Sequence, residues 1–212
     1  MQITIKQSTI KAVSHAMAKS DVRYYLNGML IHSNGHDTRI VATDGHRLNI
    51  AIIERTMLVE APQQFIIPDT LVNTICKCKA PRHEKSPEVT FNFSDGKVSA
   101  LLPDGTESVA KLIDGRYPDY DRIIPHTLSG EAAQYNPVYV MDAFKACADY
   151  MGLKTPSVAL SMNGQGCAAM SCGDFAALIM PWRADPVSAL DSRLLSPIAS
   201  PEVVDALDAI EA

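Results

Sequence analysis

The sequence lacks the features that mark membrane-embedded and exported proteins. Its 212 residues contain no run of about eighteen apolar residues, the length that a helix needs to cross a bilayer. The N-terminal stretch Met1–Lys6 alternates between apolar and polar residues like a strand, and it has no apolar block of the kind found in signal peptides. We therefore expect a cytoplasmic protein with no membrane partner.

Motifs of common catalytic and cofactor sites are missing as well. The sequence contains no GxSxG, HExxH, P-loop or GxGxxG pattern. The run Asp44-Gly45-His46-Arg47 does bring an acid, an imidazole and a guanidinium together. However, Asp-Gly is typical of a hairpin turn, and adjacent strand residues point to opposite faces. We expect no enzyme, no catalytic residue and no cofactor.

Cysteine spacing gives no sign of a metal site. The five cysteines are odd in number, and their spacings match no common zinc pattern. Free thiols in a reducing compartment explain them, and no metal is expected. The five are Cys76, Cys78, Cys147, Cys167 and Cys172.

Positive charge is also scarce. The formal net charge of −5 argues against a simple nucleic-acid binder, whose footprint is usually basic. It does not exclude a protein whose basic residues are confined to one surface, so their distribution matters more than their sum.

What the sequence does contain is one pattern repeated three times. Each copy predicts a short strand, a helix of about a dozen residues and further strands separated by glycine turns, a β-α-β-β-β unit. The helices are expected to start near Ser8, as a cap, and at Pro68 and Pro137. We predict an α+β fold with helices on one face of antiparallel sheets. Two such units can close a core together, and a third is left over.

Particular elements follow from apolar spacing and turn residues. The expected strands are 2–6, 24–33, a strand through Ala42, 46–53, 64–67, 89–93, 98–102, 108–113, 158–161, 167–170 and 175–180. The turns are Asn34-Gly35, Asp44-Gly45, Asp95-Gly96, Asp104-Gly105, 163–166 and Gly173-Asp174. The apolar helix stripes are Ile10, Val13 and Met17, then Leu71, Ile75 and Cys78, then Val140, Phe144, Cys147 and Met151.

Basic residues gather on the first two expected helices. Lys11, His15 and Lys19 follow one another at helical spacing, and Lys77 and Lys79 are followed by the basic stretch 82–85. A solvated helix face explains such residues, and so does a surface that faces phosphates. The run Ile179–Arg183 combines apolar residues with the single tryptophan, which is typical of a protein-binding hot spot and also of a core edge.

Four stretches carry a family resemblance. They are Asp21–Leu30 (DVRYYLNGML), Val41–Leu48 (VATDGHRL), Lys111–Tyr120 (KLIDGRYPDY) and Ile179–Arg183 (IMPWR). Their order and content resemble the bacterial DNA polymerase III beta subunit, the sliding clamp. Residues 1–125 resemble its complete middle domain, and residues 132–183 resemble the second half of its last domain. Residues 184–212 have no counterpart and are expected to form a flexible tail.

The resemblance implies a DNA-clamp fold and a ring whose helices surround duplex DNA without reading its sequence. Double-stranded DNA is then one partner, and the residues expected to face it are Lys11, His15, Lys19, Tyr24, Tyr25, Lys77, Lys79 and Arg82.

The resemblance also implies a pocket for the clamp-binding motif of DNA polymerases, clamp loaders and repair proteins. Trp182 stands where the family usually has methionine, and its larger side chain is expected to narrow or reshape the pocket. The expected lining is Leu26, Thr43, Gly45, His46, Arg47, Leu48, Pro118, Arg122, Ile123, Asn136, Tyr139, Val158, Leu178, Ile179, Met180, Pro181, Trp182 and Arg183.

Three units per chain raise the question of assembly. A family ring uses twelve units, so four chains are needed, and a two-fold contact between third units is the simplest way to cover each odd half. We therefore expect a homotetrameric processivity factor. The alternative is a decoy without a ring that sequesters host replication proteins through the pocket. The tail run Leu194–Ile198 (LLSPI) loosely resembles a pocket-binding peptide and is a candidate occupant.

Overall fold

The computed structural model describes residues 2–33, 37–53, 63–81 and 87–182. The elements of the first two units are β1 (Gln2–Lys6), α1 (Gln7–Ser14), the 3-10 turn η1 (Tyr24–Leu26), β2 (Gly28–Ser33), β3 (Thr38–Thr43), β4 (Arg47–Ile53), β5 (Gln63–Pro68), α2 (Asp69–Lys77), β6 (Glu88–Ser94), β7 (Lys97–Leu101) and β8 (Glu107–Lys111). The 3-10 turn η2 (Tyr120–Ile123), α3 (Pro137–Met151), β9 (Ala168–Cys172) and β10 (Phe175–Ile179) follow. Among the described helices, none is long and apolar enough to cross a membrane.

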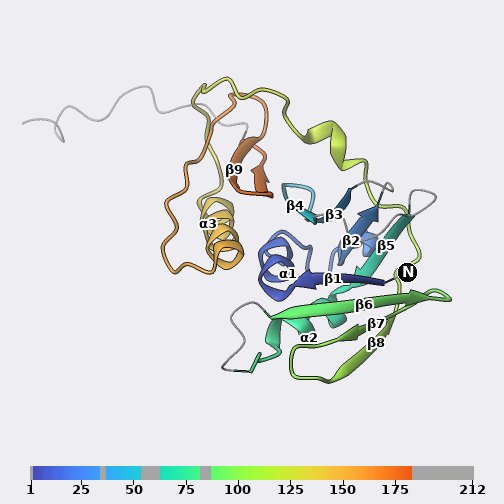
Figure 1. The fold of residues 1–212 in the computed structure, drawn as a ribbon. Coiled ribbons are helices and arrows are strands. Elements are labelled where there is room, and N and C mark those ends of the chain that lie inside the picture. The colour runs from blue at the N-terminus through green and yellow to red at the C-terminus, as the bar shows by residue number, and fades with distance from the viewer. Residues whose placement is uncertain (1, 34–36, 54–62, 82–86, 183–212) are drawn as a thin grey trace, which may run out of the picture. The chain divides into compact units, whose positions relative to one another are not determined.

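The first two units exchange their first strands. β1 precedes α1 but pairs with β6 of the second unit, and β5 precedes α2 but pairs with β2 of the first. The result is a four-stranded antiparallel sheet, β1-β6-β7-β8, and the start of a larger sheet, β5-β2-β3-β4 (Figure 1). Each unit therefore completes the sheet of the other.

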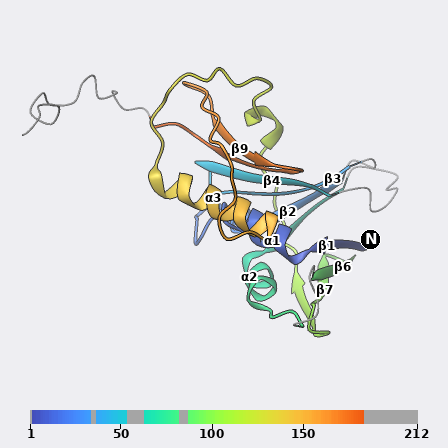
Figure 2. The ribbon, with the colours of Figure 1, turned by 60° about the vertical axis from the view of Figure 1, so that its left-hand side comes forward.

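The third unit extends the larger sheet. β10 pairs antiparallel with β4, from Phe175 opposite Ala51 to Ile179 opposite Arg47, which gives the six-stranded order β5-β2-β3-β4-β10-β9. Helices α1 and α3 lie side by side against one face of this sheet (Figures 1 and 2). Residues far apart in the sequence thus share one sheet and one helical layer.

Burial occurs on both faces of the six-stranded sheet. On β2, Met29 and Ile31 join the core beneath the helices, whereas Leu30 points to a second cluster on the opposite face. That second cluster also includes Leu48 and Leu178 from β4 and β10. The alternation follows from the two-residue period of a strand. It places a second apolar layer on the side of the sheet away from the helices.

Helix starts agree with the sequence only in part. α1 begins at Gln7, spans 8 residues and has no side-chain cap, so the expected Ser8 cap is wrong. Its first N–H donates to the carbonyl of Pro87 at 2.8 Å, a tertiary partner that replaces a cap. Pro68 ends β5, and α2 begins at Asp69. The start of α3 at Pro137 is confirmed, with the Asn136 side chain accepting from the N–H of Val138 at 3.0 Å.

Other expected elements also differ. The stretch 24–33 begins as the 3-10 turn η1 before β2. The expected strand 158–161 forms only one bridge, between Ser161 and Ala169, so the third unit departs from the β-α-β-β-β pattern. Met151 is exposed, whereas Ala143 and Ala146 are buried beside Cys147. The turn at 34–35 and the tail 184–212 lie outside the described residues.

Candidate functional site

An apolar pocket lies on the face of the six-stranded sheet away from the helices. Its volume is about 230 Å³, and its walls come from η1, the β3–β4 turn, η2 and the strand β10. The lining residues are Arg23, Leu26, Thr43, Gly45, Arg47, Leu48, Pro118, Asp119, Tyr120, Ile123, Cys167, Leu178 and Met180. Two stretches far apart in the chain therefore meet in one cavity.

Many of the expected pocket residues line this cavity. They are Leu26, Thr43, Gly45, Arg47, Leu48, Pro118, Ile123, Leu178 and Met180. Others expected there lie outside its lining: His46, Arg122, Asn136, Tyr139, Val158, Ile179, Pro181 and Trp182. Arg183 lies outside the described residues. Tyr139 and Ile179 instead line a narrow crevice beneath α3 with no water-sized space.

Four lining residues were missed: Arg23, Asp119, Tyr120 and Cys167. Three of them lie within the stretches Asp21–Leu30 and Lys111–Tyr120 that carry the resemblance, so a sequence signal was present. No signal marked Cys167, because only the fold brings its thiol within 2.9 Å of the carbonyl oxygen of Ile123.

The β3–β4 turn shapes one rim of the pocket. Gly45 adopts a φ of 92°, which favours glycine, and its N–H donates to the Thr43 hydroxyl at 3.0 Å. That hydroxyl donates to the carbonyl of Arg47 at 2.6 Å. The Asp44 carboxylate accepts from the N–H groups of His46 and Arg47 at 2.9 and 3.1 Å. Local hydrogen bonds thus hold the turn in one shape.

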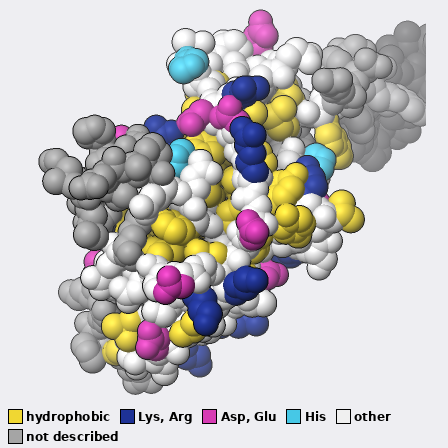
Figure 3. All heavy atoms as spheres, turned by 90° about the vertical axis from the view of Figure 1, so that its right-hand side faces the viewer, with side chains coloured by type: hydrophobic (Ala, Val, Ile, Leu, Met, Phe, Trp, Pro, Cys, Tyr) yellow, Lys and Arg dark blue, Asp and Glu magenta, His cyan; other side chains and the backbone are white. Residues whose placement is uncertain are grey.

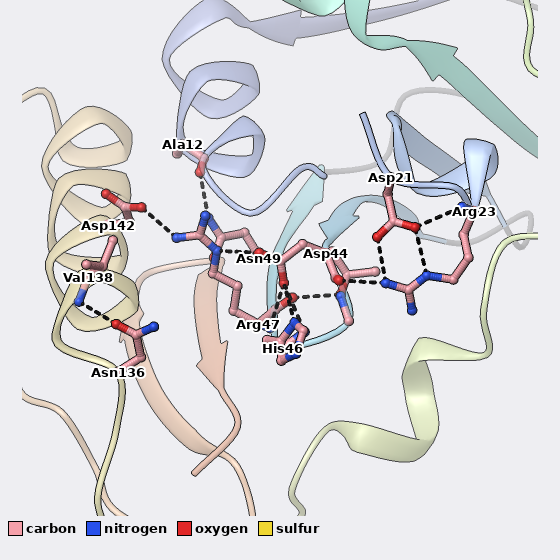
Figure 4. Close-up of polar contacts among 12 residues, drawn as sticks. Ala12, Asp21, Arg23, Asp44, His46, Arg47, Asn49, Asn136, Val138 and Asp142 are labelled. Carbon is pink, nitrogen blue, oxygen red and sulfur yellow. Dashed lines mark hydrogen bonds and ion pairs between the residues drawn. The ribbon is translucent and has the colours of Figure 1, made fainter. Parts of the chain in front are cut away.

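Arg47 links this turn to helix α3 (Figure 4). Its guanidinium lies 3.0 Å from Asp44 and 2.6 Å from Asp142, and its Cζ lies 4.6 Å from the ring centre of Tyr139. Burial acts to raise the pKa of Asp142, but hydrogen bonds and charge from Arg47 and Lys145 lower it overall. The Arg47 side chain therefore joins residues of the first and third units.

A second arginine lies at the rim and is already paired. Arg23 Nη2 lies 2.7 Å from Asp21 Oδ2 and also donates to the carbonyl of Asp44 at 3.0 Å (Figure 4). The hydrogen bond from Arg23 is the main reason that the pKa of Asp21 falls to about 2. The positive charge of Arg23 is thus balanced by Asp21 at the pocket entrance.

Two polar groups in or behind the pocket wall, on Tyr117 and Cys167, are buried and neutral. Tyr117 is buried behind the turn, and its hydroxyl accepts from the N–H of Thr43 at 3.1 Å. Burial raises the pKa of the Tyr117 hydroxyl and of the Cys167 thiol, so both are neutral at pH 7. Leu26, Leu48 and Leu178 make the deeper part of the wall apolar, which suits apolar side chains.

The expected basic stripe on α1 is not continuous. α1 ends at Ser14, whose hydroxyl donates to the carbonyl of Lys11 at 2.7 Å, so Lys19 does not lie on the helix. His15 Nε2 lies 2.8 Å from Asp149 of α3. An acidic residue of another helix is therefore paired with His15, the middle residue of the expected stripe.

The remaining residues expected to face DNA are dispersed. Lys77 and Lys79 are exposed at the end of α2, and Arg82 lies outside the described residues. Tyr24 is exposed and meets Tyr25 edge to face, with ring centres 5.7 Å apart. On the face shown in Figure 3, Lys and Arg side chains lie among acidic and hydrophobic ones. Positive charge is therefore interleaved with acid on that face.

Comparison with known families identifies the family of the chain. The family model for the DNA polymerase III beta subunit, central domain, matches residues 2–119. This chain belongs to the DNA polymerase III beta subunit family. The match includes the pocket wall formed by the β3–β4 turn, whereas Leu178 and Met180 on the facing wall lie beyond it.

Curated relatives agree with the family. The chain is 31% identical over 162 residues to the beta sliding clamp of Pseudomonas aeruginosa, covering 73% of this chain and 43% of that relative. The beta sliding clamp of Vibrio cholerae is 34% identical over 133 residues, covering 60% and 35%. The chain thus spans less than half the length of these relatives. They are named as clamps and not as enzymes, in agreement with the sequence-based expectation.

Solved structures of the DNA polymerase III beta subunit family show the same fold. A Pseudomonas aeruginosa sliding clamp with ligand superposes with a TM-score of 0.69 at 23% identity, covering 87% of this chain and 66% of that one. A putative DNA polymerase III beta subunit from Eubacterium rectale gives 0.68 at 17% identity, with the same coverages. The predicted DNA-clamp fold is confirmed.

Proposed function

We propose that this chain is a sliding-clamp-like processivity factor for DNA polymerase. Copies of it form a ring around duplex DNA, and the pocket binds the clamp-binding segments of DNA polymerases, clamp loaders or repair proteins. The observation that carries the proposal is the pocket itself, because its two walls come from the matched central domain and from the third unit. Four chains, with three units each, supply the twelve units of a ring.

The chemistry of the pocket supports a peptide ligand. Its volume of about 230 Å³ is smaller than the roughly 300–1,000 Å³ of sites that hold a whole drug-sized molecule. The exposed side chains of Ile123 and Met180 flank a buried apolar floor that includes Leu26 and Leu178. A few apolar side chains of an extended segment suit such a cavity. Arg23 and Arg47 lie at its rim, and each is paired with an acidic side chain.

Griselimycin provides a probe, since a Pseudomonas aeruginosa sliding clamp has been solved bound to it. We expect griselimycin to bind this chain, and to bind the Ile123→Lys variant at least tenfold more weakly. The difference corresponds to about 1.4 kcal/mol or more of binding free energy. It arises because the ammonium group of the introduced lysine loses water in an apolar site. Isothermal titration calorimetry measures both affinities. Val109→Lys is the matched control, since Val109 is exposed on β8 outside the pocket lining. Equal weakening by both substitutions would contradict the assignment of this pocket as the binding site.

Ring formation predicts a dependence on DNA topology. The proposed DNA side carries Lys11 from α1 and Lys77 from α2, together with Lys19 and Lys79, which lie beyond the ends of these helices. The net charge of −5 limits simple electrostatic binding. We expect the protein, once loaded, to stay on a nicked circular plasmid during gel filtration and to leave it after linearisation. Equal retention on both forms would rule out a ring. Retention on neither, with griselimycin still bound, would instead indicate a decoy.

A further inference from the structure

β8 is an edge strand with one open side. In the four-stranded sheet β1-β6-β7-β8 it pairs with β7, and no other described strand pairs with it. Figure 1 shows β8 as the outermost strand of that sheet. An edge strand of this kind presents N–H and C=O groups to which a further strand can bind.

The backbone groups that point outward from β8 follow from its hydrogen bonds. The N–H of Leu112 donates to the carbonyl of Gly96, next to β7, at 2.9 Å. The N–H of the next residue, Ile113, donates instead to the carbonyl of Ile66 in β5, also at 2.9 Å. Successive residues of a strand direct their backbone groups to opposite sides. The residues of β8 whose N–H and C=O groups point away from β7 are therefore Glu107, Val109 and Lys111.

The chain already contains one junction between the last strands of two units. β4 ends the first unit and β10 ends the third, and the two strands pair antiparallel, from Phe175 opposite Ala51 to Ile179 opposite Arg47. β8 is the last strand of the second unit and has no partner of this kind among the described strands. The fold thus joins units through antiparallel last strands and leaves one such strand available.

The side chains along the open edge are arranged symmetrically. Glu107, Val109 and Lys111 are exposed, whereas Ala110 packs against the main core. Val109 is 62% exposed, and Leu101 on the neighbouring strand β7 is 48% exposed. An acid therefore lies two residues before an apolar residue, and a base lies two residues after it. Because antiparallel pairing reverses the order of residues, this edge is complementary to a copy of itself.

Lys111 faces another lysine within its own sheet. It lies directly opposite Lys97 of β7, and like charges in that position are destabilising. Among the residues that the structure describes, no ion pair includes Glu107, Lys97 or Lys111. An acidic side chain on the open side of Lys111 would offset this repulsion.

We propose that the open edge of β8 binds β8 of a second copy of this chain, antiparallel and about a two-fold axis at Val109. The two Val109 residues then lie opposite each other, and Glu107 of each copy lies opposite Lys111 of the other. The outward N–H and C=O groups of these three residues exchange hydrogen bonds, so two four-stranded sheets become one continuous sheet. The proposal rests on the ring of the proposed function and deepens it by naming the surface through which second units meet.

Other two-fold registers of the same two strands match the charges less well. An axis at Glu107 or at Lys111 sets like charges opposite each other. An axis at Ser108 or at Ala110 sets one charged residue opposite Val109 and the other beyond the end of the strand. The axis at Val109 is the register that gives both charged residues a partner of opposite sign.

The symmetry of a four-chain ring is consistent with this contact. Each chain in such a ring meets one neighbour at each of its two ends. If third units meet about a two-fold axis, the opposite ends of neighbouring chains must also meet about a two-fold axis. Those ends belong to the second units, and β8 is the open last strand that a second unit presents.

Charge reversal tests the contact. Glu107→Lys sets lysines opposite each other, and Lys111→Glu does the same with glutamates. By sedimentation velocity at micromolar concentration, we expect each variant alone to show half the mass of the wild-type assembly. A mixture of the two variants, and the double variant Glu107→Lys with Lys111→Glu, restore opposite charges and should recover the wild-type mass.

Griselimycin binding and circular dichroism show whether each variant is folded. Val109→Lys, the control in the pocket test, should keep griselimycin binding and still lose the contact, because two lysines would meet on the axis. A folded single variant with the mass of the wild type would overturn the contact, and so would a mixture that stays at half mass.

Cross-linking tests the register directly. Val109→Cys is expected to give disulfide-linked dimers under mild oxidation with diamide, because opposite Cα atoms about 5.5 Å apart are within the range that a disulfide spans. Leu101→Cys is the control, since two copies of this position would be separated by three strand spacings, about 14 Å. The wild type, with its five native cysteines, gives the background. An equally low yield from all three proteins would overturn the register.

Further outcomes separate this contact from the proposed function. Retention of the wild type on circular DNA, with an unchanged mass in both single variants, would leave the ring and overturn the β8 contact. Recovery of mass in the mixture, without retention of the wild type on circular DNA, would support the contact and overturn the ring. A wild type that is monomeric at micromolar concentration would overturn both.

Discussion

Replacement of Arg47 by alanine is expected to lower the free energy of unfolding by about 2–4 kcal/mol. Removing one partner of a buried ion pair costs about 3–5 kcal/mol, because the other charge is left without compensation. The Arg47 side chain is 14% exposed and Asp142 is 22% exposed, so solvent reduces that cost. The substitution also removes the packing of Arg47 on Tyr139. Urea unfolding at pH 7, followed by circular dichroism, measures the change.

Arg122→Ala is the matched control for Arg47→Ala. Arg122 lies 2.8 Å from Asp119, but the two side chains are 83% and 54% exposed, and such pairs contribute little. We expect its change to stay within about 0.5 kcal/mol. A similar small change for Arg47→Ala would show that the first and third units do not depend on this link.

The effect of Arg47→Ala should also depend on pH. The pKa of Asp142 is lowered in the folded protein, so its ion pair stabilises the fold fully above the unfolded value of about 3.9. The contribution is lost as the pH falls through the lower folded pKa. The difference between the wild type and Arg47→Ala should therefore shrink in acid, and a difference that grows there would contradict this origin.

Replacement of Gly28 by alanine is expected to destabilise the protein by about 3 kcal/mol or more. Gly28 begins β2 and lies opposite Pro68, the last residue of β5. An added Cβ would lie 2.6 Å from the carbonyl oxygen of Ile67 and 2.9 Å from side-chain atoms of Ile66 and Ile113. Overpacking usually costs about 1–3 kcal/mol, and here the closest atom is backbone, which moves only with β5. Urea unfolding measures the loss.

Gly115→Ala is the control for Gly28→Ala. The added Cβ would lie 3.1 Å from the Cβ of Tyr25 and 3.4 Å from Cε2 of Tyr24. A shift of a few tenths of an ångström in η1, which carries both tyrosines, relieves that contact, and alanine reduces the entropy of the unfolded chain. We expect the free energy of unfolding of Gly115→Ala to change by no more than about 1 kcal/mol. Equal losses for Gly28→Ala and Gly115→Ala would contradict the role of close packing at β2.

Much of the pocket could be predicted, because its parts are local in the sequence. Asp44-Gly45 specifies a turn through residues next to one another, and the Thr43 and Asp44 side chains complete it with bonds to neighbouring backbone. Cys167 could not be predicted, because its place beside Ile123 depends on β10 pairing with β4. Likewise, the Asp149 partner of His15 becomes visible only when α3 packs on α1.

The sequence by itself determined most of the helices, strands and tight turns, because spacing, proline and glycine act over a few neighbouring residues. The tertiary structure decided which strands are neighbours, since β1 joins β6, and β5 joins β2, through contacts distant in the chain. It also decided that the stretch 158–161, which alternates like a strand, forms only the single bridge at Ser161. A strand is completed by hydrogen bonds to a neighbour, and no local pattern can supply that neighbour.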